Sequence, residues 1–266
     1  MIMNLEQLKK ENIDLKRKLS IAKLWMEREV RSQVKKIAKG KVSRMTSDTK
    51  DVFFSENIEE IITKKISDFF GEIMLLNVPA TVIENIITAE INYFNLRENP
   101  NSDGLGVITS YHKSLDTLIE SFITKGFRKF AKKKGQTQLR KNDSLEKSLN
   151  SVVNQGYILS VGRLFHLISI IKNQDNDDDE IVELFDYGKC FKEYLIKYDY
   201  IYEILFNADF FHNFESLVDS EILGKKRHVG KISFDETKHA RSLLIGDFKD
   251  TNSLIYKFIE IAKVDY

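Results

Sequence analysis

Cysteine, proline and glycine are scarce in this chain of 266 residues, which has one cysteine, two prolines and 12 glycines. The single Cys190 excludes an intrachain disulfide and a zinc cluster built on several cysteines, and it fits a reducing compartment. Scarce proline and glycine favour long helices over a fold with many tight turns. No run of the sequence approaches the ~20 apolar residues that a membrane span needs.

The N-terminus also lacks the apolar segment of a secretory signal, because the first ten residues become charged at once. Motifs for nucleotide-phosphate loops, zinc proteases and serine hydrolases are missing as well, and the five histidines lie far apart. We therefore expect a cytoplasmic protein with no membrane association, no metal site and no cofactor.

Apolar residues recur at helical spacing, and no segment has the sustained two-residue alternation of a half-buried strand. The sequence predicts an all-α fold, with a long N-terminal helical arm and a multi-helix bundle. We expect an arm at residues 1–45, a helical domain at 46–173 and a C-terminal subdomain at 174–266, the last two possible as one continuous bundle. The expected helices are 5–39, 57–76, 79–96, 107–134, 143–155, 157–172, 180–197, 199–223, 233–245 and 250–264.

The N-terminal helix carries a short heptad repeat between residues 5 and 26. With Leu5 at position a, Asn12 occupies the next a position, and leucines at 8 and 15 occupy d positions. A buried asparagine at position a sets the register of parallel dimeric coiled coils. This pattern predicts self-association through residues 5–26, and packing of the helix on its own domain is the alternative.

Local signals predict helix starts and buried side chains. Ser233 with Glu236 matches a capping box, and Asp143 with Glu146 resembles one. The helix 157–172 is almost continuously apolar, so we expect it at the centre of the core with His166 as a buried, hydrogen-bonded imidazole. Cys190 lies among aromatic residues, and we expect a packed thiol there.

Charge is strongly segregated although the net charge is only +1. Residues 16–44 contain eleven basic residues against Glu27 and Glu29, a net charge of +9. Residues 125–141 contain eight basic residues and no acid, with Phe127 and Phe130 interleaved. Acidic residues gather between positions 175 and 186. Such segregation indicates that the charges create a directed electrostatic field at the surface rather than serving general solubility.

Cations spaced by three and four residues on a helix share a face and can track phosphates. The sequence therefore predicts nucleic-acid binding, DNA or RNA, and the absence of a base-reading motif predicts that binding is largely independent of sequence. Docking to an acidic protein is one alternative, and basic faces that are merely solvated, or that pair with the acidic stretch at 175–186, are the other. The predicted phosphate contacts are Arg28, Arg31, Lys35, Lys36, Lys39, Arg128, Lys129, Lys132, Lys133, Lys134, Arg140, Lys225 and Arg227.

One stretch adds a family resemblance. From Gly224 the chain has a basic turn, then a His-x-Gly, and then a Ser-x-x-Glu that opens an amphipathic helix. With this pattern, residues 224–264 resemble the last part of HEPN domains, including those of bacterial abortive-infection proteins. The resemblance implies a metal-independent endoribonuclease in which His228 activates a ribose hydroxyl. Here Arg227 directly precedes His228, closer than in the family's catalytic motif, which leaves a non-cleaving RNA-binding or scaffold version open.

The interpretation we favour is an oligomeric, non-enzymatic nucleic-acid-binding component of a bacterial defence or genome-maintenance system. The resemblance alone supports the choice of system. A HEPN-like ribonuclease centred on His228 and a non-catalytic protein-interaction subunit are the two alternatives.

Overall fold

The computed structural model describes residue 30 and residues 56–135, 144–175, 184–224, 226 and 230–262. Throughout these ranges the regular structure is helical and no strand occurs, which confirms the predicted all-α fold. The chain divides into two compact units, residues 1–77 and residues 78–266. The predicted coiled coil at residues 5–26 lies outside the described residues and stays a prediction.

The first unit contains helices α2 (Glu56–Phe70) and α3 (Glu72–Leu75). One continuous helix over 57–76 was the expectation, and it is wrong at Gly71. This residue has φ 74° and ψ 144°, a conformation that glycine adopts without steric cost and that ends a helix. Ile66 and Phe70, one helical turn apart, are both buried and form an apolar stripe on α2.

The second unit contains the remaining described helices, and it includes residues on both sides of position 173, where the sequence suggested a boundary. Three of its short elements are not α-helices: η1 and η2 are π turns and η3 is a 3₁₀ turn. The elements are α4 (Ala80–Glu98), α5 (Leu105–Ile119), η1 (Glu120–Thr124), α6 (Lys125–Lys134), α7 (Ser144–Asn150), η2 (Ser151–Gln155), α8 (Val161–Asp175), α9 (Asp186–Lys197), α10 (Asp199–Leu205), α11 (Ala208–Asp219), α13 (Phe234–Ile245), η3 (Gly246–Phe248) and α14 (Leu254–Ile261).

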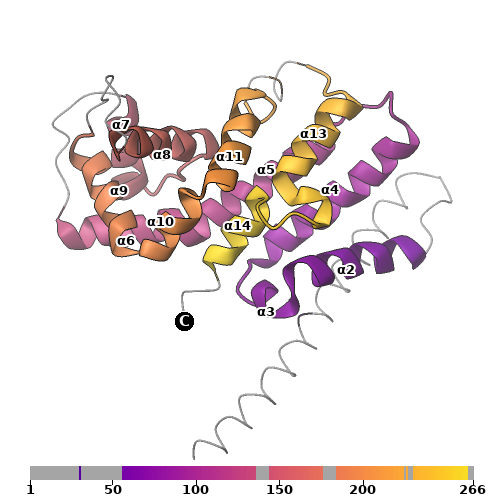
Figure 1. Cartoon of the computed structure of the whole chain (residues 1–266), viewed down its shortest axis with the longest axis horizontal. Coiled ribbons are helices and arrows are strands. Elements are labelled where there is room, and N and C mark those ends of the chain that lie inside the picture. Colours follow the sequence, from indigo (N-terminus) through magenta and orange to yellow (C-terminus); the bar gives the residue numbers. More distant parts are fainter. Residues whose placement is uncertain are drawn as a thin grey trace, which may run out of the picture. The chain divides into compact units, whose positions relative to one another are not determined.

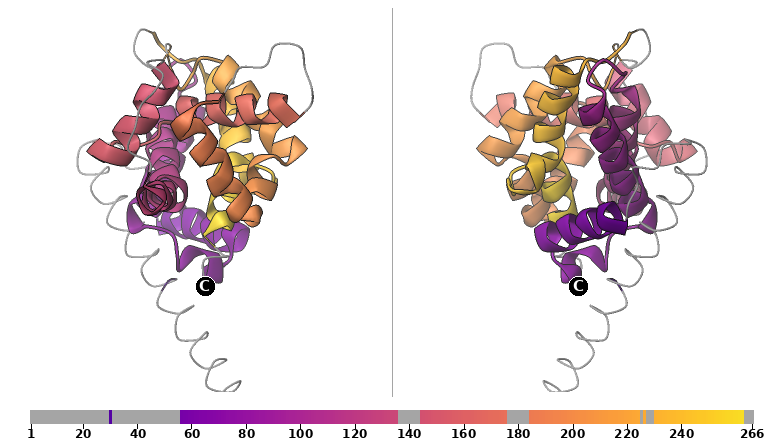
Figure 2. Two further views of the ribbon diagram at one scale, coloured as in Figure 1. Left: turned by 90° about the vertical axis from the view of Figure 1, so that its left-hand side faces the viewer. Right: turned by 90° about the vertical axis from the view of Figure 1, so that its right-hand side faces the viewer.

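A long helical rod organises the second unit. Helices α5 and α6 continue each other through η1, as expected for residues 107–134, and α4 packs along α5 (Figure 1). Seen nearly end-on, the rod lies to one side, and α9, α10, α11, α13 and α14 lie on the other (Figure 2). Helices α8, α13 and α14 contact α5, whereas α9 contacts α6. The rod therefore connects the two halves of this unit.

Aromatic side chains fill the space between α8, α11 and α14. Phe210, Phe214 and Phe258 are fully buried and meet edge to face, with ring centroids 5.5–6.2 Å apart. Phe165 of α8 adds a contact to Phe214 at 5.2 Å. Each buried phenylalanine contributes about 1.5–3 kcal/mol through loss of apolar surface to water, and edge-to-face geometry adds to this.

The expectation of a central buried helix over 157–172 needs correction. Helix α8 begins only at Val161, whereas Gly156 ends η2 in the left-handed conformation with φ 79°. The segment between them is not helical, and Tyr157 and Ile158 are 64% and 53% exposed. His166 is exposed as well, so it is not a core imidazole.

The expected helix 199–223 is also divided. Helix α10 ends at Leu205, and Asn207 then starts α11 by accepting a hydrogen bond from the Phe210 N–H through its side-chain oxygen, at 3.1 Å. A side-chain cap of this kind satisfies one of the free N–H groups of the new helix. The described helices are all too short or too polar to cross a membrane.

The capping box at the start of α13 is confirmed. The Ser233 hydroxyl accepts from the Glu236 N–H, and the Glu236 carboxylate accepts from the Ser233 N–H at 3.0 Å. Lys226 donates to the same carboxylate at 2.8 Å. These interactions, the lysine first, lower the pKa of Glu236 to about 2.

A pH titration tests this cap. Because the pKa of Glu236 is lower in the folded state, the contribution of the cap to stability is present above about pH 4.3 and is lost as pH falls toward 2. We expect Lys226→Ala to raise the pKa of Glu236, measured by NMR of the side-chain carboxyl carbon. An unchanged pKa in this variant would contradict the assignment of the lysine as the main cause.

Candidate functional site

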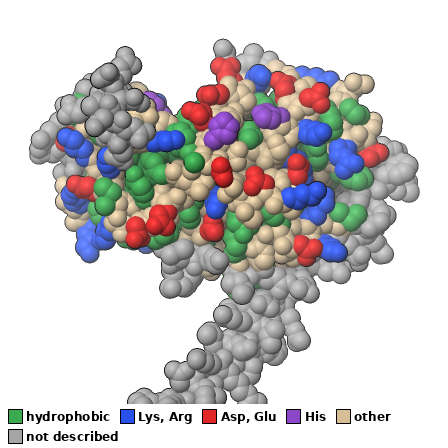
Figure 3. All heavy atoms as spheres, viewed as in Figure 1, with side chains coloured by type: hydrophobic (Ala, Val, Ile, Leu, Met, Phe, Trp, Pro, Cys, Tyr) green, Lys and Arg blue, Asp and Glu red, His purple; other side chains and the backbone are tan. Residues whose placement is uncertain are grey.

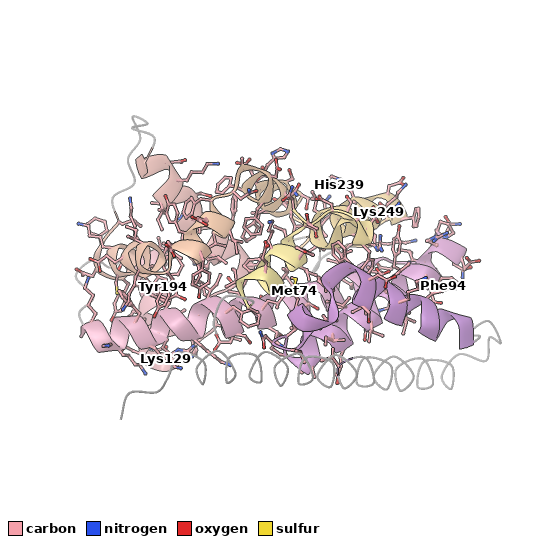
Figure 4. All side chains as sticks on the ribbon, turned by 60° about the horizontal axis from the view of Figure 1, so that its bottom comes forward. Met74, Phe94, Lys129, Tyr194, His239 and Lys249 are labelled. Carbon is pink, nitrogen blue, oxygen red and sulfur yellow. The ribbon has the colours of Figure 1, made fainter. Side chains whose placement is uncertain are left out.

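Helix α6 presents a row of lysines on one side. Lys125, Lys129 and Lys132 follow the i, i+4, i+7 spacing that aligns side chains on a helix, and Lys133 adjoins them. All four are exposed, and we call them the lysine face. The opposite side of α6 is buried through Phe127 and Ala131. Figure 4 shows Lys129 on the side of α6 that points away from Tyr194 and the packed helices.

The lysine face is not neutralised by the part of the chain that the structure describes. None of its four lysines forms an ion pair with a described residue, in contrast to two other cations of α6. Lys134 pairs with Glu193, and Arg128 pairs with Glu120 at 3.3 Å. The predicted set of phosphate contacts on α6 therefore divides into exposed lysines without an acidic partner among the described residues and two cations that pair with a carboxylate.

Arg128 is the clearest member of the second group. Its Nε donates to the Val152 carbonyl at 2.9 Å, and its Nη2 donates to the Tyr157 carbonyl at 3.0 Å. With the Glu120 contact, all three guanidinium nitrogens are engaged, and the side chain is only 19% exposed. We assign Arg128 a structural role in place of the predicted phosphate contact.

Both π turns meet at this arginine. Glu120 is the first residue of η1, and Val152 belongs to η2. In η1 the Lys125 N–H bonds to the Glu120 carbonyl, five residues back, so the turn is one residue wider than an α-helical turn. That extra residue rotates the side chains of α6 relative to those of α5. The lysine face thereby points to solvent while the apolar side of α5 faces the core.

Helix α9 fixes α6 from the other side. Phe127 meets Phe191 edge to face, with ring centroids 5.0 Å apart, and the ring centroid of Tyr194 lies 5.9 Å from both. The close approach requires Gly126, where a Cβ would lie 2.5 Å from the Tyr194 hydroxyl oxygen. The two aromatic residues interleaved with the cations therefore have packing roles. Phe127 is buried, and the ring centroid of Phe130 lies 5.8 Å from that of Tyr194.

A buried carboxylate joins α9 to α7. Glu146 accepts hydrogen bonds from the N–H groups of Tyr187 and Gly188, at 2.9 and 2.8 Å. These belong to the first turn of α9, whose free N–H groups favour a negative partner. Asp143, its expected partner in a capping box, lies outside the described residues. The cap on α9 positions the helix against which α6 packs, so it supports the lysine face indirectly.

A second polar cluster lies inside the unit. Arg241 of α13 binds Glu90 of α4 through two parallel bonds, from Nε at 2.7 Å and from Nη2 at 3.0 Å. The Tyr111 hydroxyl donates to the same carboxylate at 2.5 Å. Arg241 also pairs with Asp247, and we call these four residues the buried network. Its arginine, glutamate and tyrosine are almost fully buried.

Burial and charge both affect ionisation in this network. Burial, and then the neighbouring Glu90 carboxylate, raise the pKa of Tyr111 well above its usual value. Burial alone would lower the pKa of Arg241, but Tyr111 and Glu90 reverse this and raise it. Arg241 therefore stays charged, and its guanidinium lies 4.5 Å from the centre of the Tyr93 ring.

The backbone around Asp247 is left-handed at three successive residues. Gly246, Asp247 and Phe248 have φ values of 58°, 51° and 59°. For residues other than glycine this conformation costs about 1–2 kcal/mol each. The ion pair from Asp247 to Arg241 and the Phe248 ring, 5.7 Å from the guanidinium, offset that cost. The cluster thus fixes a strained turn, and we assign it a structural role.

The other predicted site residues are not placed. Arg28, Arg31, Lys35, Lys36, Lys39, Arg140, Lys225, Arg227 and His228 all lie outside the described residues. Cys190 is buried, as expected, and burial raises the pKa of its thiol. In the described ranges no group of three or more His, Cys, Asp or Glu side chains could hold a metal ion.

The surface around α11, α13 and α14 gives a useful contrast. Lys and Arg side chains are interspersed there with Asp and Glu, so no field of one sign builds up (Figure 3).

Comparisons with protein-family models, with curated proteins and with solved structures find no match to this chain. The lysine face, on which charge of one sign does gather, is therefore the candidate site.

Proposed function

We propose that the protein binds nucleic acid through the lysine face of α6, largely without regard to sequence. The observation that supports this most is the row of four exposed lysines without an acidic partner among the described residues. Helix α6 is rigidly held by Arg128 on one flank and by α9 on another, so the lysines are presented on a fixed scaffold. A fixed row of cations is suited to a phosphate backbone.

The kinds of side chain on this face support binding without base recognition. Lysine contacts phosphate as a point charge, whereas base edges are read by paired donors and acceptors of Arg, Asn or Gln. The one arginine of α6, Arg128, is engaged in internal hydrogen bonds. Binding should therefore depend on phosphate number and spacing far more than on sequence.

A salt series tests the proposal. Each phosphate neutralised by a lysine releases condensed counterions, so affinity should fall steeply as salt rises. With about four phosphates contacted, raising salt from about 50 to about 200 mM should weaken binding to duplex DNA by about 10²-fold. Fluorescence anisotropy with labelled duplex DNA and single-stranded RNA measures this. Absence of binding to either probe at the lower salt would refute the proposal.

A further inference from the structure

An exposed aromatic residue lies beside the lysine face. Tyr157 is 64% exposed, and Ile158 after it is 53% exposed, although large apolar side chains are mostly buried elsewhere in the described residues. We propose that Tyr157 is a stacking platform for an unpaired base and that the lysine face next to it holds the flanking phosphates. The ligand would then be a single strand; this inference rests on the proposed function.

Arg128 places Tyr157 at this position. The guanidinium donates to the Tyr157 carbonyl at 3.0 Å, which attaches the segment to the flank of α6. Lys125 and Lys132 lie three residues before and four residues after Arg128, so both are its neighbours on the helix surface. The backbone of Tyr157 is therefore held next to two lysines of the lysine face.

The segment is also fixed at its start. Gly156 ends η2 in the left-handed conformation, and the Tyr157 N–H bonds to the Ser151 carbonyl at 3.2 Å. Both main-chain groups of Tyr157 are thus engaged, while its side chain remains exposed. Because the backbone of Tyr157 is already ordered, stacking of a base on the ring should cost little conformational entropy.

An aromatic residue next to a row of cations favours single strands over duplexes. In a duplex the base faces are covered by neighbouring base pairs, whereas in a single strand they are free to stack on a side chain. Stacking does not depend on base identity, because every base has a π face. The arrangement therefore fits a sequence-tolerant single-strand site.

The test compares three probes that differ in accessible bases, using the full chain and fluorescence anisotropy at about 50 mM salt. The probes are an oligothymidylate of about 12 nucleotides, an abasic strand of the same length and a duplex of the same length. Wild type should bind the oligothymidylate more tightly than the abasic strand. Tyr157→Ala should weaken only oligothymidylate binding, by about 5- to 140-fold.

Two control variants separate stacking from structural damage. Tyr157→Phe keeps the ring and should bind within about twofold of wild type, because stacking needs the ring and not the hydroxyl. Ile196→Ala removes a similarly exposed apolar side chain, 60% exposed on α9, and should change nothing. If Tyr157→Ala weakens all three probes equally, or none, the stacking inference is wrong.

The outcomes also distinguish this inference from the proposed function. If reversing the lysine-face charges weakens all three probes while Tyr157→Ala has no effect, the proposed function stands and the stacking inference fails. If the reversed protein binds every probe as wild type does, the proposed function fails. If wild type binds none of the probes, both are refuted.

Discussion

Replacing Arg241 with alanine should lower the free energy of unfolding by about 3–5 kcal/mol, because it leaves the buried Glu90 charge without its cationic partner. The Glu90 carboxylate is almost fully buried and receives two of its hydrogen bonds from this guanidinium. The variant also releases Asp247, which lies on the left-handed turn. Urea unfolding followed by circular dichroism measures the change.

Matched variants test whether the loss of stability in Arg241→Ala comes from the unpaired buried charge. Arg97→Ala removes an exposed arginine from α4 and should change the free energy of unfolding by no more than about 0.5 kcal/mol. The double change Glu90→Gln with Arg241→Met removes both charges and should be less destabilising than Arg241→Ala alone. A loss below about 1 kcal/mol in Arg241→Ala would contradict the role given to the buried network.

The same network predicts sensitivity to alkaline pH. The pKa of Tyr111 is raised in the folded state, so its contribution to stability is complete below about pH 10, the pKa of tyrosine in an unfolded chain. Stability is lost as pH rises above that value toward the folded-state pKa. Tyr111→Phe should flatten the dependence between about pH 9 and 11. An unaltered profile in this variant would exclude Tyr111 as its origin.

Reversing three lysines of α6 should nearly abolish binding to nucleic acid. In the variant Lys125→Glu, Lys129→Glu, Lys132→Glu, about three phosphate contacts are lost, and affinity at about 100 mM salt should fall by about 10² to 10³-fold. The slope of log affinity against log salt should become shallower by about 2.7 for duplex DNA. Because phosphates carry no base information, all sequences should be affected alike.

The chain offers a control with the same change in net charge. Lys113, Lys238 and Lys249 are exposed lysines of the same unit that do not lie on α6. Reversing these three should leave most of the affinity intact, and circular dichroism should be near wild type for both variants. Equal losses in the two triple variants would mean that net charge, and not the lysine face, governs binding. Failure of the α6 variant to fold would favour pairing with the acidic stretch.

Most of the helices were predictable, because their signals are local. Spacing of apolar residues predicted the rod over 107–134, and Ser233 with Glu236 predicted the start of α13 to the residue. Two of the errors arose at breaks set by one residue. Gly71 ends a helix in a conformation that favours glycine, and Asn207 starts a new helix with its side chain. A window of hydrophobicity averages over such single positions.

The site was predictable only in outline. The basic block 125–141 was visible in the sequence, but exposure divides its members: Arg128 is engaged inside the fold and Lys129 is exposed. Tyr157 was interpreted as part of a buried helix, and no local signal connects it to α6. The buried network joins residues from three separate helices and a turn, and such pairings depend on tertiary structure. The hydrogen bond from Arg128 connects Tyr157 to α6, and the hydrogen bond from Arg241 connects α13 to Glu90 of α4.

The pairing of Glu90 with Arg241 has a consequence for synthesis of the chain. The two residues are separated by 151 positions, so the ribosome must make nearly the whole second unit before the carboxylate gains its cationic partner. Until then α4 and α5 can pair with each other and Tyr111 of α5 can donate to the Glu90 carboxylate, but without the Arg241 guanidinium the glutamate charge on their shared apolar surface opposes close packing. The N-terminal half of the unit should thus stay loosely packed during translation and become fully ordered only when α13 arrives.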